Sequence, residues 1–169
     1  VVAVTGTNGK TSVASFARQI WALLGHEAVN IGTTGVEGAY AAPGLHTTPD
    51  PLTLQRVLAE MAAAGVSHVA MEASSHGLDQ RRMEAVRLAA AGFTNLTQDH
   101  LDYHGDMESY FHAKLRLFSE LLPEDGIAVV NLDDRYGPRV AAACTAREIE
   151  VIGIGQYTED AALKITGRR

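Results

Sequence analysis

Near the start of the chain, the residues VTGTNGKTSVASF could form a phosphate-binding loop. Gly6 and Gly9 let backbone N–H groups turn toward an anion, and a helix that begins near Lys10 would add the partial positive charge of its N-terminus. Lys10 would contact the β- and γ-phosphates of a nucleotide, and the Thr11 hydroxyl would face Mg²⁺. The loop is short, because the usual spacing needs a glycine where this chain has Val4. The alternative is an ordinary strand–turn–helix junction that contains a lysine.

A second candidate is the carboxylate of Glu72, at the end of an otherwise apolar predicted strand in the segment MEASSHGLDQRR. A carboxylate at such a position is costly unless it is paired or binds a cation. Mg²⁺ takes oxygen ligands and keeps several waters, so one or two carboxylates plus phosphates can hold it. Glu72 is therefore a metal-site candidate, and it could equally cap the next turn.

The segment FTNLTQDHLDYHGDMESYFHAK is dense in histidine and aspartate, with Asp99, His100, Asp102, His104 and Asp106. Their spacing matches no standard zinc pattern, and no cysteine lies nearby. Histidines in such runs are more often capping or hydrogen-bonding groups than ligands. His100 differs because it follows the end of a predicted strand, where the phosphates would lie.

Lys114 lies among aromatic and aliphatic residues in SYFHAKLRLF, near the apolar side of a predicted helix. Such a lysine usually buries its stem and keeps its ammonium in water. A partly buried lysine can also have a shifted pKa and react as a neutral amine. The residue types alone do not choose between these two interpretations.

The elements that must position these groups alternate between strands and helices. Apolar runs predict strands at 1–5, 28–31, 66–72, within 88–96, 127–131 and 150–154, and helical spacing predicts helices at 11–24, 106–122 and 135–146. Another helix would be capped by Asp50, begin near Pro51 and end at Gly65. Residues 32–48 are predicted to be a loop. This alternation predicts an α/β fold: a three-layer, P-loop-type structure with a mostly parallel sheet flanked by helices.

Composition narrows the function classes. The formal charge of −6 argues against a nucleic-acid binder, which needs a basic surface. The one cysteine, Cys144, cannot form an internal disulfide, which favours a reducing compartment and a cytoplasmic protein. We expect no membrane span, because no stretch is apolar for long enough, and the first residues do not predict a signal peptide. The abrupt start on a strand and the ending LKITGRR suggest a piece of a longer protein.

Together, the motifs resemble the central ATP-binding domain of the Mur ligases, the ADP-forming amide ligases of peptidoglycan synthesis. TGTNGKT is that family's short form of the phosphate loop. The strings HTTPDP, MEASSHGLDQRR, FTNLTQDHLDYHGDMESYFHAK and VVNLDD are most similar to the MurE type. That type adds the third amino acid, diaminopimelate or lysine, to UDP-N-acetylmuramoyl-L-alanyl-D-glutamate.

The resemblance implies roles for individual residues. Lys10, Glu72, His100 and Lys114 would be catalytic, and Thr11, Glu72, His100 and Lys114 would serve Mg²⁺, with Lys114 carbamylated by CO₂. ATP would be bound by Gly6, Thr7, Asn8, Gly9, Lys10, Thr11 and Ser12, with Asn131 near the adenine. The UDP-muramoyl-dipeptide would contact Thr47, Thr48, Ser74, Gln80 and Arg82.

The resemblance also implies a reaction and a domain organisation. The substrate carboxylate would attack the γ-phosphate of ATP, and the amino acid's amine would attack the resulting acyl phosphate. Residues 1–169 would be a central domain that stops early, and the N- and C-terminal domains of the ligase would be further partners. We therefore expect the isolated chain to be nearly inactive.

Three alternatives stay open. A folylpolyglutamate or cyanophycin synthetase shares the short loop and the ligation of a carboxylate to an amine. A P-loop NTPase or kinase-like domain would hydrolyse nucleotide or phosphorylate a partner. An ATP-binding remnant without ligase activity would bind nucleotide only.

Overall fold

The computed structural model describes residues 1–42, 46–159 and 161–166 of the chain. Eight strands form one sheet in the order β3-β2-β4-β1-β5-β6-β7-β8, and every neighbouring pair is parallel except β2 and β3. The strands are β1 (Val2–Thr5), β2 (Ala28–Gly32), β3 (Gly35–Gly38), β4 (His68–Glu72), β5 (Ala90–Phe93), β6 (Ile127–Asn131), β7 (Glu150–Gly155) and β8 (Leu163–Lys164). The chain runs from β1 toward β2 and later returns to the other side of β1 at β5. Open α/β sheets bind ligands at such a reversal, so the carboxyl end of β1 is where a site is expected.

The helices connect these strands. They are α1 (Lys10–Leu23), α2 (Pro51–Ala63), α3 (Ser75–Asp79), α4 (Leu101–His104), α5 (Met107–Arg116) and α6 (Gly137–Thr145). A π-helical turn, η1 (Leu117–Leu121), continues α5. Asp50 caps α2 and Asp106 caps α5, each through a side chain that accepts a backbone N–H. No helix in the described ranges is long and apolar enough to cross a membrane.

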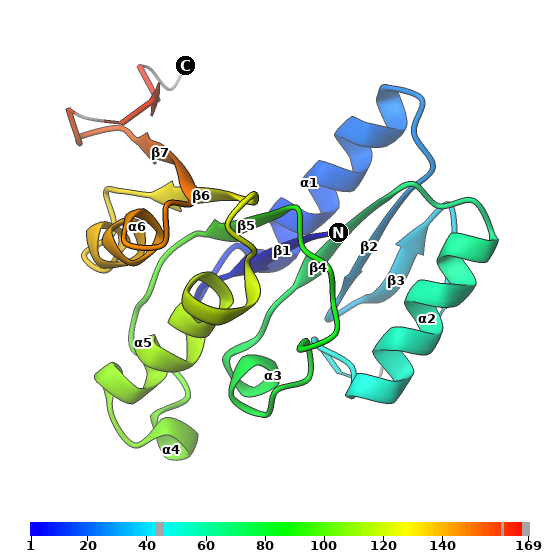
Figure 1. Cartoon of the computed structure of the whole chain (residues 1–169), viewed down its shortest axis with the longest axis horizontal. Helices are drawn as coiled ribbons and strands as arrows, with labels where there is room; N and C mark the ends of the chain where they lie inside the picture. The colour runs from blue at the N-terminus through cyan, green and yellow to red at the C-terminus, as the bar shows by residue number, and fades with distance from the viewer. Residues whose placement is uncertain (43–45, 160, 167–169) are drawn as a thin grey trace.

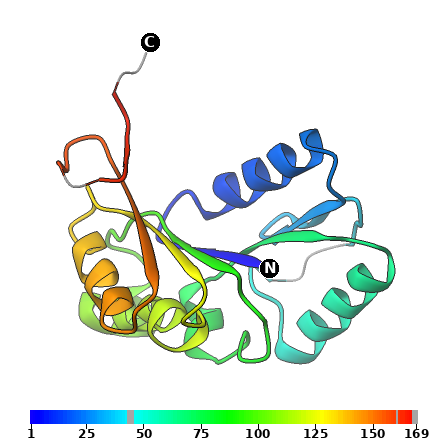
Figure 2. The same ribbon diagram turned by 45° about the horizontal axis from the view of Figure 1, so that its top comes forward.

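The molecule has three layers, as the sequence predicts (Figures 1 and 2). Helix α1 lies on one face of the sheet, and α2, α3, α5 and α6 lie on the other. The α1 layer is thin: Ala14 is its buried residue, and large apolar side chains such as Phe16 and Leu23 are 61% and 88% exposed. Helices therefore flank both faces of the sheet, as the sequence predicts, although α1 buries few of its side chains.

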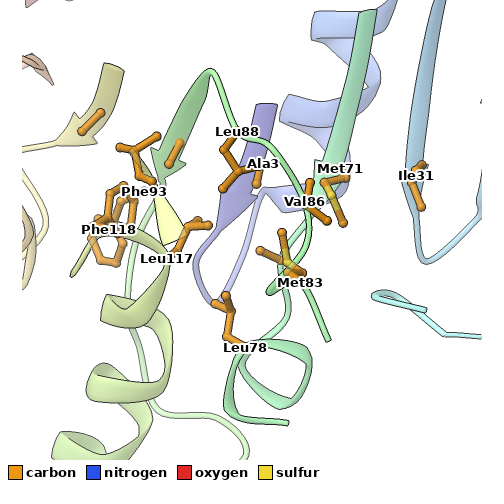
Figure 3. Close-up of a cluster of buried hydrophobic side chains, with 14 of the residues drawn as sticks. Ala3, Ile31, Met71, Leu78, Met83, Val86, Leu88, Phe93, Leu117 and Phe118 are labelled. Atoms are coloured by element: carbon orange, nitrogen blue, oxygen red, sulfur yellow. The ribbon is translucent and has the colours of Figure 1, made fainter. Parts of the chain in front are cut away.

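The main apolar core lies between the sheet and the helices on its thicker side. Figure 3 shows Leu78 of α3 and the pair Leu117 and Phe118 gathered near strand residues, among them Phe93. The rings of Phe93 and Phe118 pack edge to face with centroids 6.5 Å apart. Cys144 is fully buried in α6, where burial raises the pKa of its thiol to about 11. It is a packing residue, as its apolar neighbours in the sequence indicate.

The structure corrects one predicted element and adds detail to others. Residues 32–48 are not all loop, because β3 (Gly35–Gly38) forms an antiparallel hairpin with β2. Residues 43–45 of that predicted loop and residues 167–169 of the ending LKITGRR lie outside the described residues. The helix predicted at 106–122 is present, but its last turn widens into η1. The short helices α3 and α4 follow strand ends where only polar segments were expected.

Candidate functional site

Two glycines with positive φ shape the loop between β1 and α1, where the sequence predicts a phosphate-binding loop. Gly6 (φ 148°) and Gly9 (φ 85°) both adopt positive φ values that other residues rarely take. A Cβ atom on Gly6 would lie 1.9 Å from Thr94 Oγ1, so only glycine fits. Gly9 is the N-cap of α1, and no side chain there competes for the first N–H groups of the helix. These donors and the helix dipole can therefore face an anion.

The segment that follows β5 holds this loop in place. Asn95 accepts hydrogen bonds from Thr7 N at its carbonyl (2.8 Å) and from Asn8 N at its side-chain oxygen (3.0 Å). The hydroxyl of Thr94 donates to the carbonyl of Asn8 at 2.6 Å. Sequence reasoning singled out the string FTNLTQDH but not these two residues. The feature of the sequence that could have indicated them is that two polar residues come directly after the end of a predicted strand.

Lys10 and Lys114 meet at one carbonyl oxygen. The ammonium of Lys10 donates to the carbonyls of Gly6 (2.9 Å) and Thr7 (2.8 Å). From α5, the ammonium of Lys114 donates to the same carbonyl of Gly6 at 2.8 Å. Both ammonium groups therefore lie at the loop between β1 and α1.

Lys114 does not extend its head into water, because the side chain is only 1% exposed. Its Nζ lies 4.6 Å from the centre of the Tyr110 ring. Burial first, and then the charge of Lys10, lower the pKa of Lys114 to about 7. Burial also lowers the pKa of Lys10, whereas Glu72 and Asp99 act in the opposite direction. The interpretation in which the ammonium stays in water therefore does not fit the structure.

Glu72 is buried at the carboxyl end of β4, beside the start of the loop. It is 1% exposed, and its register partner in β1 is Val4. One carboxylate oxygen accepts a hydrogen bond from Thr33 N at 2.8 Å. A Cβ atom on Gly32 would lie 1.9 Å from that oxygen, so the glycine makes room for the carboxylate. Glu72 thus caps the turn after β2, not the next turn along the chain. Its negative charge also raises the pKa of Lys10, so the carboxylate acts electrostatically on the loop.

The residues predicted to contact the muramoyl-peptide gather around the end of β4. Thr48 is buried, and its hydroxyl lies 3.0 Å from both the backbone N and the hydroxyl of Ser74. A guanidinium nitrogen of Arg82 donates to the carbonyl of Thr48 at 2.8 Å, and Arg82 Nε donates to Gln80 Oε1 at 3.0 Å. The hydroxyl of Thr47 lies 3.0 Å from that of Thr33, which also contacts Glu72. The structure therefore brings all five predicted residues to one place.

A cavity of about 770 Å³ opens beside this group, between the β2–β3 hairpin and α2. Gln80 and Arg82 form part of its wall, and Ile31, Val36 and Val57 contribute apolar surface. A cavity with an apolar floor and a few polar groups is typical of a binding site for an organic ligand.

His100 lies at the N-cap of α4 in a left-handed conformation (φ 50°). Its Nε2 is 3.5 Å from Asp99 Oδ2, and its ring packs edge-on against His76 with centroids 5.0 Å apart. The ring centroid of His104 lies 5.6 Å from that of His76 in the same cluster. Burial is the main cause that lowers the pKa of His76 and of His104. In the described part of the chain, no three His, Cys, Asp or Glu side chains form a group that could hold a metal by themselves. His76 is not among the site residues predicted from the sequence.

Asn131 lies at the end of β6, where a hollow of about 470 Å³ is lined by Asn131, Asp133 and Tyr157 among others. The amide of Asn131 donates to the carbonyl of Thr94 at 2.7 Å, which connects this hollow to the segment that holds the loop. The carboxylate of Asp133 accepts the backbone N–H groups of Gln156, Tyr157 and Thr158. These bonds, with that of Gln156 first, lower the pKa of Asp133 to about 2.

Comparison with known proteins identifies relatives of this chain. A sequence model of the family described as Mur ligase middle domain matches residues 4–168. A UDP-N-acetylmuramoyl-L-alanyl-D-glutamate–2,6-diaminopimelate ligase of Brucella melitensis is 54% identical over 97% of this chain and 34% of its own length. The ligase of the same name from Caulobacter vibrioides is 51% identical over 99% of this chain and 35% of its own length. The chain thus spans about a third of the length of these curated relatives.

Solved structures agree with the sequence relatives. A structure with the same enzyme name is 34% identical, with a TM-score of 0.84, over 95% of this chain and 32% of that one. MurF from Acinetobacter baumannii (20% identical, TM-score 0.71, over 92% of this chain and 31% of that one) and Escherichia coli FolC with ADP (19% identical, TM-score 0.66, over 94% and 44%) share the fold.

Proposed function

The chain belongs to the family of Mur ligase middle domains, and from this membership we propose that it is the ATP-binding part of an ADP-forming amide ligase. The ligase adds the third amino acid to UDP-N-acetylmuramoyl-L-alanyl-D-glutamate in peptidoglycan precursor synthesis. The names of its relatives support diaminopimelate rather than lysine as that amino acid. Their bacterial sources support a bacterial cytoplasmic enzyme. The observation that carries the proposal is the contact of Lys10 and Lys114 with one carbonyl of the phosphate loop, beside buried Glu72.

In this proposal the loop from Gly6 to Ser12 binds the phosphates of ATP. Its backbone N–H groups and the N-terminus of α1 supply the positive potential, and Lys10 turns from the loop carbonyls to the β- and γ-phosphates. The hollow next to Asn131 takes the adenine end of the nucleotide. The loop follows the carboxyl end of β1 and Asn131 ends β6, with β5 between these two strands.

The residues around the loop fit Mg²⁺. The Thr11 hydroxyl and the Glu72 carboxylate are hard oxygen donors, and nucleotide phosphates would complete the coordination. His100, whose ring centroid lies 6.1 Å from that of Tyr110, is a further residue proposed to serve the ion. Burial lowers the pKa of Lys114 to about 7, so part of its amine would be neutral at pH 7 and would react with CO₂ to give a carbamate and a proton. That carbamate would add a further anionic oxygen donor. When bound, Mg²⁺ would offset the negative charge of the phosphates.

The reaction proceeds in two steps. The terminal carboxylate of the muramoyl-dipeptide, held by Arg82 and the Thr47, Thr48, Ser74 and Gln80 group, attacks the γ-phosphorus of ATP. ADP leaves, and Lys10 stabilises the negative charge on the transferring phosphoryl group. The amine of the amino acid then attacks the acyl carbonyl, and phosphate departs from the tetrahedral intermediate as the amide forms. Water must be excluded, because it would hydrolyse the acyl phosphate.

Two alternative functions, a folylpolyglutamate synthetase and an NTPase, have less support. The FolC neighbours are below 25% identity and support the shared fold, whereas the relatives at about half identity are muramoyl-peptide ligases. A plain NTPase would not need the five-residue group beside the cavity of about 770 Å³.

ATP binding by the chain, measured by titration calorimetry with Mg²⁺, tests this proposal. We expect Lys10→Ala to weaken ATP binding by at least about tenfold, because a charged hydrogen-bond donor to the phosphates is lost. Lys164→Ala is the matched control, since Lys164 is an exposed lysine of β8 and should leave the affinity unchanged. Equal affinity in the wild type and Lys10→Ala would contradict the proposed site.

A further inference from the structure

One turn of α5 faces the phosphate loop with two buried side chains. Tyr110 and Lys114 are four residues apart, so they lie on the same side of the helix, and each is 1% exposed. Lys114 Nζ reaches the carbonyl of Gly6 at 2.8 Å, and the hydroxyl of Tyr110 lies 3.2 Å from Thr7 Oγ1. The helix therefore contacts two successive residues of the loop. The proposed reaction uses Lys114 but gives no role to Tyr110.

The hydrogen bonds around Thr7 fix the direction of the contact with Tyr110. Thr97 N donates to Thr7 Oγ1 at 3.0 Å, and Thr7 Oγ1 donates its own hydrogen to the carbonyl of Thr97 at 3.1 Å. A hydroxyl has one hydrogen and two lone pairs, so Tyr110 must be the donor to the remaining lone pair. Burial raises the pKa of Tyr110, which keeps the phenol protonated for this role.

We propose that Tyr110 is a positioning residue that acts through Thr7 to hold the phosphate loop in its binding conformation. Its hydroxyl completes the bonding of Thr7, so this side chain stays fixed between α5 and the segment after β5. The inference rests on the proposed function, because it takes the loop to be the site of the ATP phosphates. In this proposal Tyr110 acts without contacting the phosphates.

The ring and the hydroxyl of Tyr110 can be separated experimentally. The ring lies 4.6 Å from Lys114 Nζ, and its centroid is 5.1 Å from that of His104. Tyr110→Phe keeps this packing and removes only the bond to Thr7. Thr7→Val removes the same bond from the other side, together with the two bonds to Thr97, and the double variant shows whether Tyr110 and Thr7 act together.

Binding of ATP·Mg²⁺ and of adenosine to the wild-type chain and these three variants tests the proposal. We expect Tyr110→Phe to weaken ATP binding about five- to tenfold, the effect of one hydrogen bond, and to leave adenosine binding unchanged. The double variant should bind ATP no more weakly than Thr7→Val alone. Tyr40→Phe is the matched control, because the Tyr40 hydroxyl also donates a hydrogen bond, at 2.7 Å to Glu60, but away from the loop.

The outcomes separate this inference from the proposed function. If Lys10→Ala weakens ATP binding while Tyr110→Phe binds ATP as the wild type does, the positioning role is wrong and the proposed site stands. Equal losses of ATP and adenosine binding in Tyr110→Phe would indicate a general structural role and overturn the inference. If the wild-type chain binds no ATP, both proposals fail together.

Discussion

At the scale of single residues, Lys114 is the group whose surroundings differ most from those of a surface lysine. In the unfolded chain its pKa is near 10.4, whereas burial and Lys10 lower it to about 7 in the fold. Below pH 7 Lys114 is protonated in both the folded and the unfolded state, and its buried charge destabilises the folded state. Between pH 7 and about 10.4 the unfolded state binds more protons, so stability rises with pH.

The variant Lys114→Met should remove this dependence, because it keeps the length of the side chain without a titrating group. We expect the unfolding free energy of the wild type, relative to this variant, to rise by about 2 kcal/mol between pH 7 and pH 9. Urea unfolding in CO₂-free buffer measures it. A difference between the two proteins that stays constant with pH would show that Lys114 is protonated in the fold.

The sequence predicts the charged and glycine residues of the site better than the residues that support them. Gly6, Lys10 and Glu72 stand out because each is unusual at the end of an apolar strand or in a tight turn. Tyr110 and Asn95 do not, because a tyrosine in a helix and an asparagine after a strand are common. Their roles depend on contacts across about 90 to 100 residues of sequence, which only the fold brings together.

At the scale of elements, the loop between β7 and β8 depends on one carboxylate of another loop. Asp133 accepts the N–H groups of Gln156, Tyr157 and Thr158, and its pKa of about 2 keeps it ionised down to acidic pH. A carboxylate with a lowered pKa contributes stability that is present above its unfolded pKa of about 3.9 and is lost as the pH falls through about 2.

Asp133→Asn should loosen this loop, because the amide NH₂ cannot accept a backbone N–H. We expect faster hydrogen exchange at the amides of residues 156–158 and little change in the amides of β1. Exchange measured by NMR at pH 5 tests it, with Asp125→Asn as an exposed control. Unchanged protection at these three amides would mean that other contacts hold the loop.

The sequence predicts the long elements well because their apolar periodicity is strong. Strand β6 is found at the predicted residues 127–131, and α2 has the predicted cap at Asp50. Strand β3 is missed because its four residues, GVEG, contain two glycines and a single large apolar side chain. It is held as a strand by its pairing with β2, which is a tertiary effect that outweighs weak local propensity.

At the scale of the whole molecule, the proposed reaction needs more than the loop and its neighbours. The chain spans about a third of the length of its relatives, and we propose that N- and C-terminal ligase domains hold the uridine nucleotide and the amino acid. Exclusion of water from the acyl phosphate would require those domains to close over the site.

The chain by itself should therefore form almost no amide. Incubation with ATP, Mg²⁺, UDP-N-acetylmuramoyl-L-alanyl-D-glutamate and diaminopimelate, followed by mass spectrometry of the products, measures this directly. We expect product at the background level of the Lys10→Ala variant. Sustained turnover above that background would show that the described residues suffice for ligation.

We propose above all that the loop between β1 and α1 binds the phosphates of ATP next to Lys10 and Lys114. The most direct measurement is a crystal structure of the chain with Mg²⁺ and a non-hydrolysable ATP analogue. We expect the triphosphate to lie against the backbone N–H groups of residues 6–12, with Lys10 Nζ moved from the carbonyls of Gly6 and Thr7 to the β- and γ-phosphates. A nucleotide bound elsewhere on the chain, with Lys10 still on those carbonyls, would contradict it.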